Sequence, residues 1–186
     1  MHKMDKRVFP PGHLNIEDEK FMKIFAQTYL FGGAIMVELG SYKGRSACCW
    51  LEGLKERGGK LITIDNHRDC DLDSNFTGAD YVKSMNEWGY IGRNNIHIIG
   101  DITEVSRFFN IEIDALFIDA LHTYEAVSND FNNWNKFVKL NGYIIFHDYN
   151  ASFEGVTRFC NELKENKSWE FISQHGSCAL FKRIGK

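Results

Sequence analysis

A strand, a glycine turn and a helix follow one another closely near the N-terminus, and this unit constrains the fold more than any other stretch. Residues 34–39 form an apolar run that is interrupted only by Glu38, which is typical of a buried strand. Gly40 and Gly44 bracket the turn that follows, and from Ser46 the apolar residues recur at helical spacing. Such a unit places backbone N–H groups at the carboxyl end of a strand, where nucleotide-like ligands bind in open α/β sheets.

The rest of the chain alternates between expected strands and helices. We expect further strands at 60–65, 95–101, 113–119 and 142–148, and helices at 15–31, 79–88, 123–140 and 153–165. Two final strands at 169–174 and 178–183 are separated by only three residues, which predicts a hairpin. Alternating strands and helices require a parallel sheet with right-handed crossovers, and the hairpin makes one strand antiparallel.

The composition indicates a single-domain globular protein. The chain has 186 residues, 44% of them hydrophobic and 25% charged, which suits one domain over 1–186 with a segment and helix in 1–33 and a core in 34–184. A net charge of −3 and a pI of about 6.2 disfavour nucleic acid and membrane partners. The first residues lack the apolar run of a signal peptide, so we expect a cytoplasmic location. The five cysteines form no Cys-x-x-Cys pair, and we expect reduced thiols.

An acidic residue closes nearly every expected parallel strand. These residues are Glu38, Asp65, Asp101, Asp119 and Asp148. Because the carboxyl ends of parallel strands meet at one edge of a sheet, we expect the five acids to surround a single ligand-binding crevice. The alternative is that each acid caps the helix that follows it, since Asp is common at that position.

The glycine turn resembles the first motif of class I S-adenosylmethionine-dependent methyltransferases. Its pattern is Glu38-x-Gly40-x-x-x-Gly44-x-Ser46, whereas a dinucleotide-binding fingerprint needs Gly-x-Gly-x-x-Gly. The resemblance extends over about residues 34–184. It implies a Rossmann-like α/β fold with a mostly parallel seven-stranded sheet, in which a C-terminal β-hairpin gives one antiparallel strand.

The same resemblance implies which residues bind S-adenosylmethionine. Asp65, followed by Asn66, occupies the position that holds the ribose hydroxyls, and Asp101 with the backbone of Ile102 matches the position that reads the adenine amino group. The residues expected along the methionine part are Glu38, Gly40, Ser41, Tyr42, Gly44 and Ser46, and Asp119 completes the cofactor-binding set.

The second half of the chain is similar to a small-molecule subfamily that is related to macrolide-sugar O-methyltransferases and to proteins described as cephalosporin hydroxylases. The resemblance is carried by Asp119-x-x-His122-x-Tyr124 and by His147-Asp148-Tyr149. It implies methylation of a small-molecule acceptor at a hydroxyl group. The sequence departs from the usual pattern at Ala120 and Asn141, where the family often has glycine.

Two chemistries are open for activating the acceptor. Relatives bind a divalent metal, Mg or Mn, through positions that correspond to Asp119, His147 and Asp148 here, and a metal would lower the pKa of an acceptor hydroxyl. His147 is a poorer ligand for Mg²⁺ than the acidic residue of the relatives. Without a metal, His122 or His147, beside Asp148, is a candidate general base. The structural alternatives are that His122 orients the loop after Asp119 and that His147 is a packed imidazole.

Three other questions remain open at the level of sequence. The alternatives to O-methylation are N-methylation of an amine and an inactive S-adenosylmethionine-binding protein. The acceptor site is either open or completed by a second copy in a homo-oligomer. Residues 67–94 are longer than a minimal crossover and form either a lid or an acceptor pocket, or part of the core, which the helical spacing of their aromatic residues favours. Within them, the acidic pattern from Asp69 to Asp73 lacks the glycine of a calcium loop, which disfavours calcium.

Overall fold

One seven-stranded sheet runs through the residues that the computed structural model describes, 9–68 and 75–185. The strands are β1 (Ile35–Leu39), β2 (Lys60–Asp65), β3 (Asn95–Ile99), β4 (Ile113–Ile118), β5 (Val138–Phe146), β6 (Trp169–His175) and β7 (Cys178–Arg183). Their order is β3-β2-β1-β4-β5-β7-β6. Six strands of this sheet run in one direction, and β7 runs in the opposite direction between β5 and β6. The expected fold class is therefore confirmed, while the acidic pattern at 69–73, with Cys70, lies outside the described residues.

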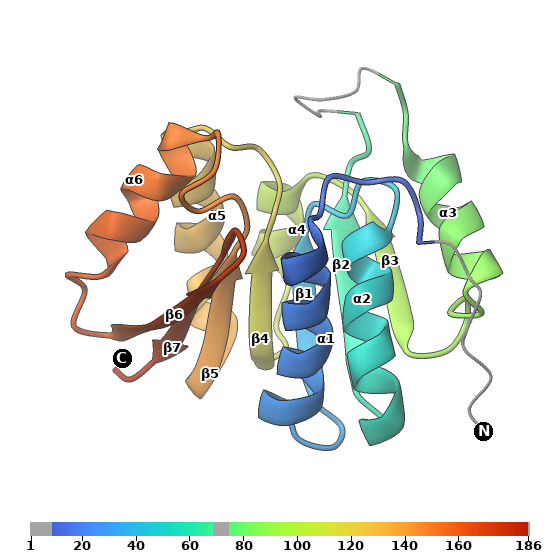
Figure 1. Ribbon diagram of the computed structural model, residues 1–186, viewed down its shortest axis with the longest axis horizontal. Coiled ribbons are helices and arrows are strands. Elements are labelled where there is room, and N and C mark those ends of the chain that lie inside the picture. The colour runs from blue at the N-terminus through green and yellow to red at the C-terminus, as the bar shows by residue number, and fades with distance from the viewer. Residues whose placement is uncertain (1–8, 69–74, 186) are drawn as a thin grey trace.

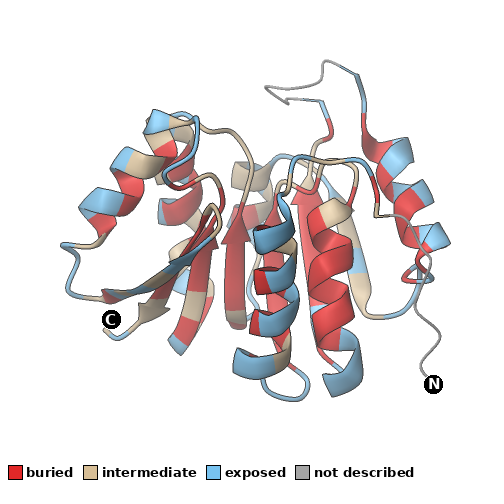
Figure 2. Cartoon of the chain, viewed as in Figure 1, coloured by how far each residue is buried: buried red, intermediate tan, exposed pale blue. Residues whose placement is uncertain are grey.

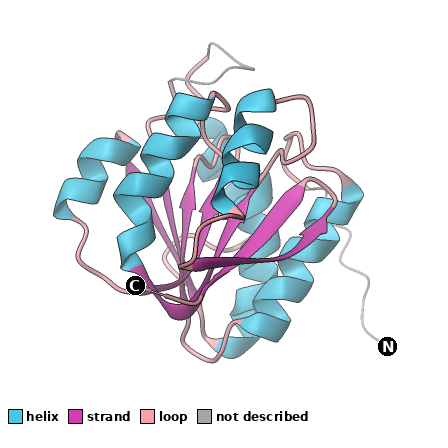
Figure 3. Ribbon diagram, turned by 90° about the vertical axis from the view of Figure 1, so that its left-hand side faces the viewer, coloured by secondary structure: helices cyan, strands magenta, loops and turns pink. Residues whose placement is uncertain are grey.

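Helices cover both faces of the sheet (Figures 1 and 3). One face carries α1 (Ile16–Tyr29), α2 (Arg45–Leu54) and α3 (Gly78–Glu87), and the other carries α4 (Ile102–Phe108), α5 (Tyr124–Trp134) and α6 (Glu154–Leu163). Short 3₁₀ turns, η1 (Lys55–Arg57) and η2 (Asn135–Phe137), end α2 and α5. Two apolar cores result, one on each side of the sheet.

The helix α2 is buried almost all round, as Figure 2 shows, although its sequence predicts a single apolar face. It packs on the sheet and against α1 beside it, so more than one of its sides is covered. Trp50 is fully buried, with Phe117 of β4 on one side and Phe25 of α1 on the other, at ring-centre distances of 5.2 and 6.1 Å. Phe25 also contacts Tyr143 of β5, so α1 covers both α2 and part of the sheet.

A capping box begins α1 and buries an acid. Asn15 accepts hydrogen bonds from the backbone of Glu17 and Asp18, and the Asp18 carboxylate accepts from the backbone N–H of Asn15. This arrangement satisfies orphan N–H groups at the helix start. Asp18 is nevertheless fully buried. Its carboxylate also contacts His147 and Ser177, which are distant in sequence and are described below.

The helix expected over 123–140 ends earlier than predicted. α5 stops at Trp134, and β5 already begins at Val138, which pairs with Ile113 of β4. Asn141 has a φ of +65° within a register shift of the β4–β5 pair. The Asn-Gly signal that we read as a helix end is therefore a bulge inside a strand.

The sequence analysis missed α4 altogether. This helix begins after Asp101, whose side chain accepts a hydrogen bond from the Glu104 backbone at 2.9 Å. The signal was available, because Asp followed three residues later by Glu is a typical helix start. The helix has only seven residues, which is too short for a clear apolar period.

Burial resolves the remaining expectations for the described residues. Within the segment 67–94, the core interpretation holds for Tyr81, Trp88 and Tyr90, which are buried, whereas Phe76 is 52% exposed. The four described cysteines are buried free thiols. In the described part of the chain, no helix has both the length and the apolar character needed to cross a membrane.

Candidate active site

Gly40 allows the end of β1 to approach the end of β4 closely. Its φ is +82°, and a Cβ at this position would overlap the backbone of Asp119 and Ala120. The Asp119 N–H donates to the Leu39 carbonyl at 2.9 Å. These contacts hold the two strand ends together where the strand order reverses, which is the usual ligand-binding position in such sheets.

Asp65 holds the glycine turn in place from the end of β2. Its Oδ2 accepts hydrogen bonds from the backbone N–H groups of Ser41 and Tyr42 at 2.7 and 2.8 Å, and its Oδ1 accepts from the His67 N–H at 2.7 Å. Tyr42 and His67 both have positive φ values, a conformation that costs energy in non-glycine residues. The Asp65 carboxylate therefore stabilises two strained loops, the one after β1 and the one after β2.

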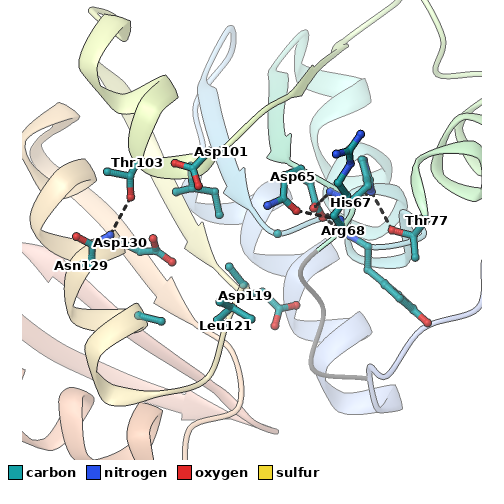
Figure 4. A pocket seen from close by; sticks show the side chains of 16 residues that line it. Asp65, His67, Arg68, Thr77, Asp101, Thr103, Asp119, Leu121, Asn129 and Asp130 are labelled. Atoms are coloured by element: carbon teal, nitrogen blue, oxygen red, sulfur yellow. Dashed lines mark hydrogen bonds and ion pairs between the residues drawn. The ribbon is translucent and has the colours of Figure 1, made fainter. Parts of the chain in front are cut away.

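A cavity of about 260 Å³ opens at these strand ends. Figure 4 shows Asp65, His67, Arg68 and Thr77 on one side of it and Asp101, Thr103, Asn129 and Asp130 on the other. Its walls are Gly40, Tyr42, Asp65, Asn66, His67, Arg68, Thr77, Asp101, Ile102, Thr103, Asp119, Ala120, Leu121, Ala126, Asn129 and Asp130. Four carboxyl groups and few basic ones line this space, which favours a cationic ligand.

Most of the residues expected to bind the cofactor lie on this cavity. The ones that line it are Gly40, Tyr42, Asp65, Asn66, Asp101, Ile102 and Asp119. Glu38, Ser41, Gly44 and Ser46 are not part of its wall. Ser41 contributes its backbone N–H to Asp65, and Gly44 begins α2 with a φ of +88°. Ser41 and Gly44 thus belong to the turn next to the cavity, while Glu38 lies in β1 and Ser46 in α2.

Glu38 is a fully buried acid in β1. Neither of its carboxyl oxygens makes a hydrogen bond of normal geometry with a described residue. Burial raises the pKa of Glu38 well above its ordinary value, the nearby Ser46 hydroxyl opposes this rise, and the charges of Asp119 and Asp65 add to it. The raised pKa favours the neutral form of this carboxyl, which lies behind the cavity wall.

The five strand-end acids do not all play one part. Asp101 caps α4, as the alternative interpretation proposed, whereas Gly44, Thr77, Thr123 and Phe153 occupy the cap positions of the helices after β1, β2, β4 and β5. Asp65, Asp101 and Asp119 line the cavity. The structure therefore gathers three of the five acids at one crevice, with Glu38 buried beneath it and Asp148 to one side.

Sequence reasoning missed the residues that α5 and the loop after β2 contribute. From α5 these are Ala126, Asn129 and Asp130, which have helical spacing and lie on one side of that helix. A polar stripe beside the apolar face of an expected helix was the available signal. His67 and Arg68 simply follow Asp65, and no pattern marked them.

A hydrogen-bonded pair of histidines supports the loop after β2. His67 Nε2 lies 2.9 Å from His97 Nε2, while His67 Nδ1 contacts Thr77 and His97 Nδ1 contacts Thr63, at 2.9 and 2.7 Å. Burial lowers the pKa of both imidazoles, that of His97 to about 4. Both rings are therefore neutral near neutral pH. The contacts with His97 and Thr77 hold the His67 ring in the cavity wall.

Next to the cavity, His122 and His147 share contacts with one carboxylate, that of Asp148. His122 Nε2 and His147 Nδ1 each lie 3.1 Å from Asp148 Oδ2. The His122 ring stacks on Phe153 with ring centres 3.9 Å apart. Burial alone would raise the pKa of Asp148, but hydrogen bonds from His122 and His147 hold it below its ordinary value. Asp148 also has a φ of +59°, a strained backbone typical of functional sites.

Both nitrogens of His147 are engaged. Nδ1 lies 3.1 Å from Asp119 Oδ1 as well as from Asp148, and Nε2 lies 3.2 Å from Asp18 and 3.1 Å from the Ser177 hydroxyl. Burial on its own would lower the pKa of His147, but the charge of Asp119 and the hydrogen bonds to three carboxylates raise it well above its ordinary value. The side chain is therefore a buried imidazolium.

The hydrogen bonds of His147 affect the metal site that the sequence predicts. Both nitrogens of His147 contact carboxylates, so His147 would have to give up the hydrogen bond from Nδ1 or Nε2 to bind a cation together with Asp119 and Asp148. A different set does have suitable spacing, because ligand atoms of Asp119, His122 and Asp148 all lie within 4.8 Å of one another. Two carboxylates and one imidazole form a donor set for Mn²⁺ or a similar ion.

Comparison with known proteins gives one family and a set of similar folds. The family model described as "Methyltransferase domain" matches residues 37–149. The uncharacterized protein R132 of Acanthamoeba polyphaga mimivirus is 31% identical over 129 residues, which are 67% of this chain and 55% of that protein. The present chain thus spans about half the length of this curated relative.

Two solved structures illustrate the fold similarity. The SAH-bound methyltransferase PaMTH1 of Podospora anserina is 15% identical with a TM-score of 0.71, and the alignment covers 90% of this chain and 78% of that one. The O-methyltransferase NovP is 12% identical with a TM-score of 0.67, again with 90% and 78% covered. At such identities the similarity establishes the arrangement of the sheet and helices.

Proposed function

Because this chain belongs to the methyltransferase domain family, we propose that it transfers the methyl group of S-adenosylmethionine to a hydroxyl group of a small molecule. The observation that carries this proposal is the position of Asp119. This residue lines the cavity, and its carboxylate also lies within 4.8 Å of ligand atoms of His122 and Asp148. One end of a ligand in the cavity would therefore lie close to His122, the proposed proton acceptor. NovP, which has the same fold, is an O-methyltransferase.

The residues on the cavity suit the methyl donor. Asp65 presents a carboxylate to the middle of the cavity, where it would accept ribose hydroxyl protons with the lone pairs that its backbone contacts leave. The carboxylate of Asp119 favours the positive charges of the amino group and the sulfonium. Gly40 keeps the space next to Asp119 clear of a side chain.

His122 is the proposed base. An imidazole that takes the acceptor proton becomes an imidazolium, and Asp148, at 3.1 Å, would orient it and stabilise that charge. His147 already gives Asp119 and Asp148 a cationic partner, so the cluster does not need a metal to hold its two carboxylates together. A divalent cation on Asp119, His122 and Asp148 would instead lower the pKa of the acceptor hydroxyl directly.

The cofactor is tested by calorimetric titration with S-adenosylhomocysteine. We expect micromolar binding by the wild type and a loss of at least about tenfold in Asp65→Asn, because that variant loses both a ribose acceptor and part of the support of the glycine turn. Glu112→Gln is the matched control, since it neutralises an exposed acid just before β4, at the opposite end of the sheet. A folded wild type that does not bind would refute the proposal.

The reaction is tested with a library of small hydroxyl and amine acceptors, with and without EDTA. We expect methylation of a hydroxyl compound that EDTA does not abolish. Loss of turnover with EDTA, restored by Mn²⁺ or Mg²⁺, would assign the Asp119, His122 and Asp148 cluster to a metal. Turnover of amines alone would make the protein an N-methyltransferase, and binding without turnover on any acceptor would leave a cofactor-binding protein.

A further inference from the structure

Asp130 is a buried carboxyl group that faces the cavity and plays no part in the proposed transfer. It projects from α5 and is only 7% exposed, yet it belongs to the cavity wall. Figure 4 places it beside Asn129, on the same side as Asp101 and Thr103. Among the described residues it has no hydrogen-bond partner. Its carboxyl group belongs to the cavity wall, so a ligand in the cavity could form hydrogen bonds with it.

The structure around Asp130 is fixed by contacts between α5 and the start of α4. Asn129 donates from Nδ2 to the Thr103 hydroxyl at 2.9 Å, and the Trp134 indole donates to the Ile102 carbonyl at 3.2 Å. Asp101, the other acid at this end, uses one carboxylate oxygen to cap α4. Asp130 is thus the acid here whose two oxygens are both available to a ligand.

The surroundings of Asp130 favour its protonated form near neutral pH. Burial raises its pKa to about 7, and the negative charge of Asp101 adds to the rise. The other charged or titratable groups on the cavity are Tyr42 after β1, Asp119 after β4, and Asp65, His67 and Arg68 at and after the end of β2. From α6, Arg158 and Glu162 contact Tyr124 instead. At neutral pH a large fraction of Asp130 therefore offers an O–H donor and a carbonyl acceptor side by side.

Adenine presents the complementary pair. A ring nitrogen that accepts a hydrogen bond lies next to an exocyclic amino group that donates one. A protonated carboxyl matches both groups at once, whereas a carboxylate would face the lone pair of the ring nitrogen. Ile102, Leu121 and Ala126 line the same cavity and would contact the apolar faces of a flat base.

We propose that Asp130 recognises the adenine base of the cofactor through two hydrogen bonds, one donated to a ring nitrogen and one accepted from the amino group. This inference rests on the proposed function, because it requires the cofactor to lie in this cavity. It gives adenine recognition to a residue of α5 in addition to the strand-end acid Asp101. It also makes cofactor binding dependent on pH.

The experiment is calorimetric titration of wild type, Asp130→Asn and Asp130→Ala with S-adenosylhomocysteine between pH 6 and pH 8.5. Wild-type affinity should fall as the pH rises, by up to about tenfold for each pH unit above 7, because the carboxyl loses its proton. Asp130→Asn should bind at every pH without this fall, since its amide keeps a donor beside an acceptor. Asp130→Ala should bind at least about tenfold more weakly at pH 6. Glu125→Gln, an exposed acid on the same helix, is the control and should follow the wild type.

A second ligand tests which chemical group is read. The purine analogue of S-adenosylhomocysteine carries hydrogen in place of the amino group, so it keeps the ring nitrogens but leaves the carbonyl of Asp130 without its donor. It should bind wild type at least about tenfold more weakly than S-adenosylhomocysteine at pH 6. Equal binding of the two ligands would overturn the inference. This comparison needs only the wild type, so it decides the matter even where a variant fails to fold.

The variants give two more outcomes that would overturn it. One is Asp130→Ala that binds S-adenosylhomocysteine as tightly as wild type at pH 6, including the case in which only turnover of the acceptor is lost. The other is a pH dependence that persists in Asp130→Asn. In both cases the proposed function stands, because wild type still binds. Failure of wild type to bind at any pH would instead refute the proposed function itself.

Discussion

His122 and His147 contact the same oxygen of Asp148 and differ in almost everything else. His147 is 5% exposed, and both its nitrogens reach carboxylates. His122 lies at the start of the α5 segment, stacked on Phe153, with its side chain 13% exposed. The two imidazoles beside Asp148 therefore differ in their ability to accept a proton from an acceptor molecule. The buried ring holds its proton tightly, whereas the outer ring is placed where an acceptor could reach it.

The difference comes from a contact over a long sequence distance. Asp18, in the first turn of α1, lies against His147 at the end of β5, and the Ser177 backbone and hydroxyl also donate to Asp18 at 2.8 and 3.0 Å. Burial would raise the pKa of Asp18, but the hydrogen bond from His147 and that from the Ser177 backbone lower it. The charge of Asp119 contributes most to the raised pKa of His147, and the N-terminal helix adds a further carboxylate, that of Asp18.

The largest expected effect separates the two histidines by activity. His122→Ala should reduce the turnover of the acceptor found in the screen by about 10²–10⁴-fold, the usual contribution of a general base. Binding of S-adenosylhomocysteine should stay near the wild-type value, because His122 is not part of the cavity wall. Steady-state kinetics and calorimetry on the same preparation provide the measurement. Turnover within threefold of wild type would show that His122 is not the base.

The next effect separates them by stability. His147→Ala should lower the free energy of unfolding by about 3–5 kcal/mol, because it leaves the buried Asp18 carboxylate without its cationic partner. Ser177→Ala is the milder control, with an expected loss of about 1 kcal/mol, since the backbone N–H to Asp18 remains. Urea unfolding measures both. A loss in His147→Ala no larger than that in Ser177→Ala would contradict a structural ion cluster.

The smallest effect is the pH dependence of that stability. The folded pKa of His147 lies above its unfolded value, so its contribution is complete below about pH 6.5 and is lost as the pH rises through the folded pKa. The folded pKa values of Asp18 and Asp148 lie below their unfolded values, so their contributions are present above about pH 3.9 and are lost as the pH falls through the folded pKa values.

The stability difference between wild type and His147→Gln should therefore be greatest between about pH 4 and pH 6.5 and should shrink at alkaline pH. Urea unfolding of both proteins at a series of pH values measures it. A difference that grows with rising pH would mean that the folded protein holds His147 neutral.

The sequence predicted the elements whose signals are local. The hairpin bounds are close to those observed, and β2 matches residue for residue, because short apolar runs with turn residues at their ends report directly on buried strands. The error at 123–140 arose where only the three residues of η2 separate a helix from a strand, and the pairing of Val138 with Ile113 shows that the strand has already begun. Asp65, Asp101 and Asp119 were predictable as cavity residues, since parallel strands place their ends at one edge.

By itself, then, the sequence determined the α/β class, the glycine turn and the edge of the sheet where the cavity opens, because each depends on neighbours in the chain or on strand polarity. Tertiary structure alone decided which acid is buried, which histidine carries a fixed proton and which face of α5 meets the cavity. Asp18 and His147 are 129 positions apart in sequence, and their charge states depend on burial and on each other. Such coupling arises only when the helices have packed on the sheet, since the low-dielectric surroundings that shift a pKa are created by that packing.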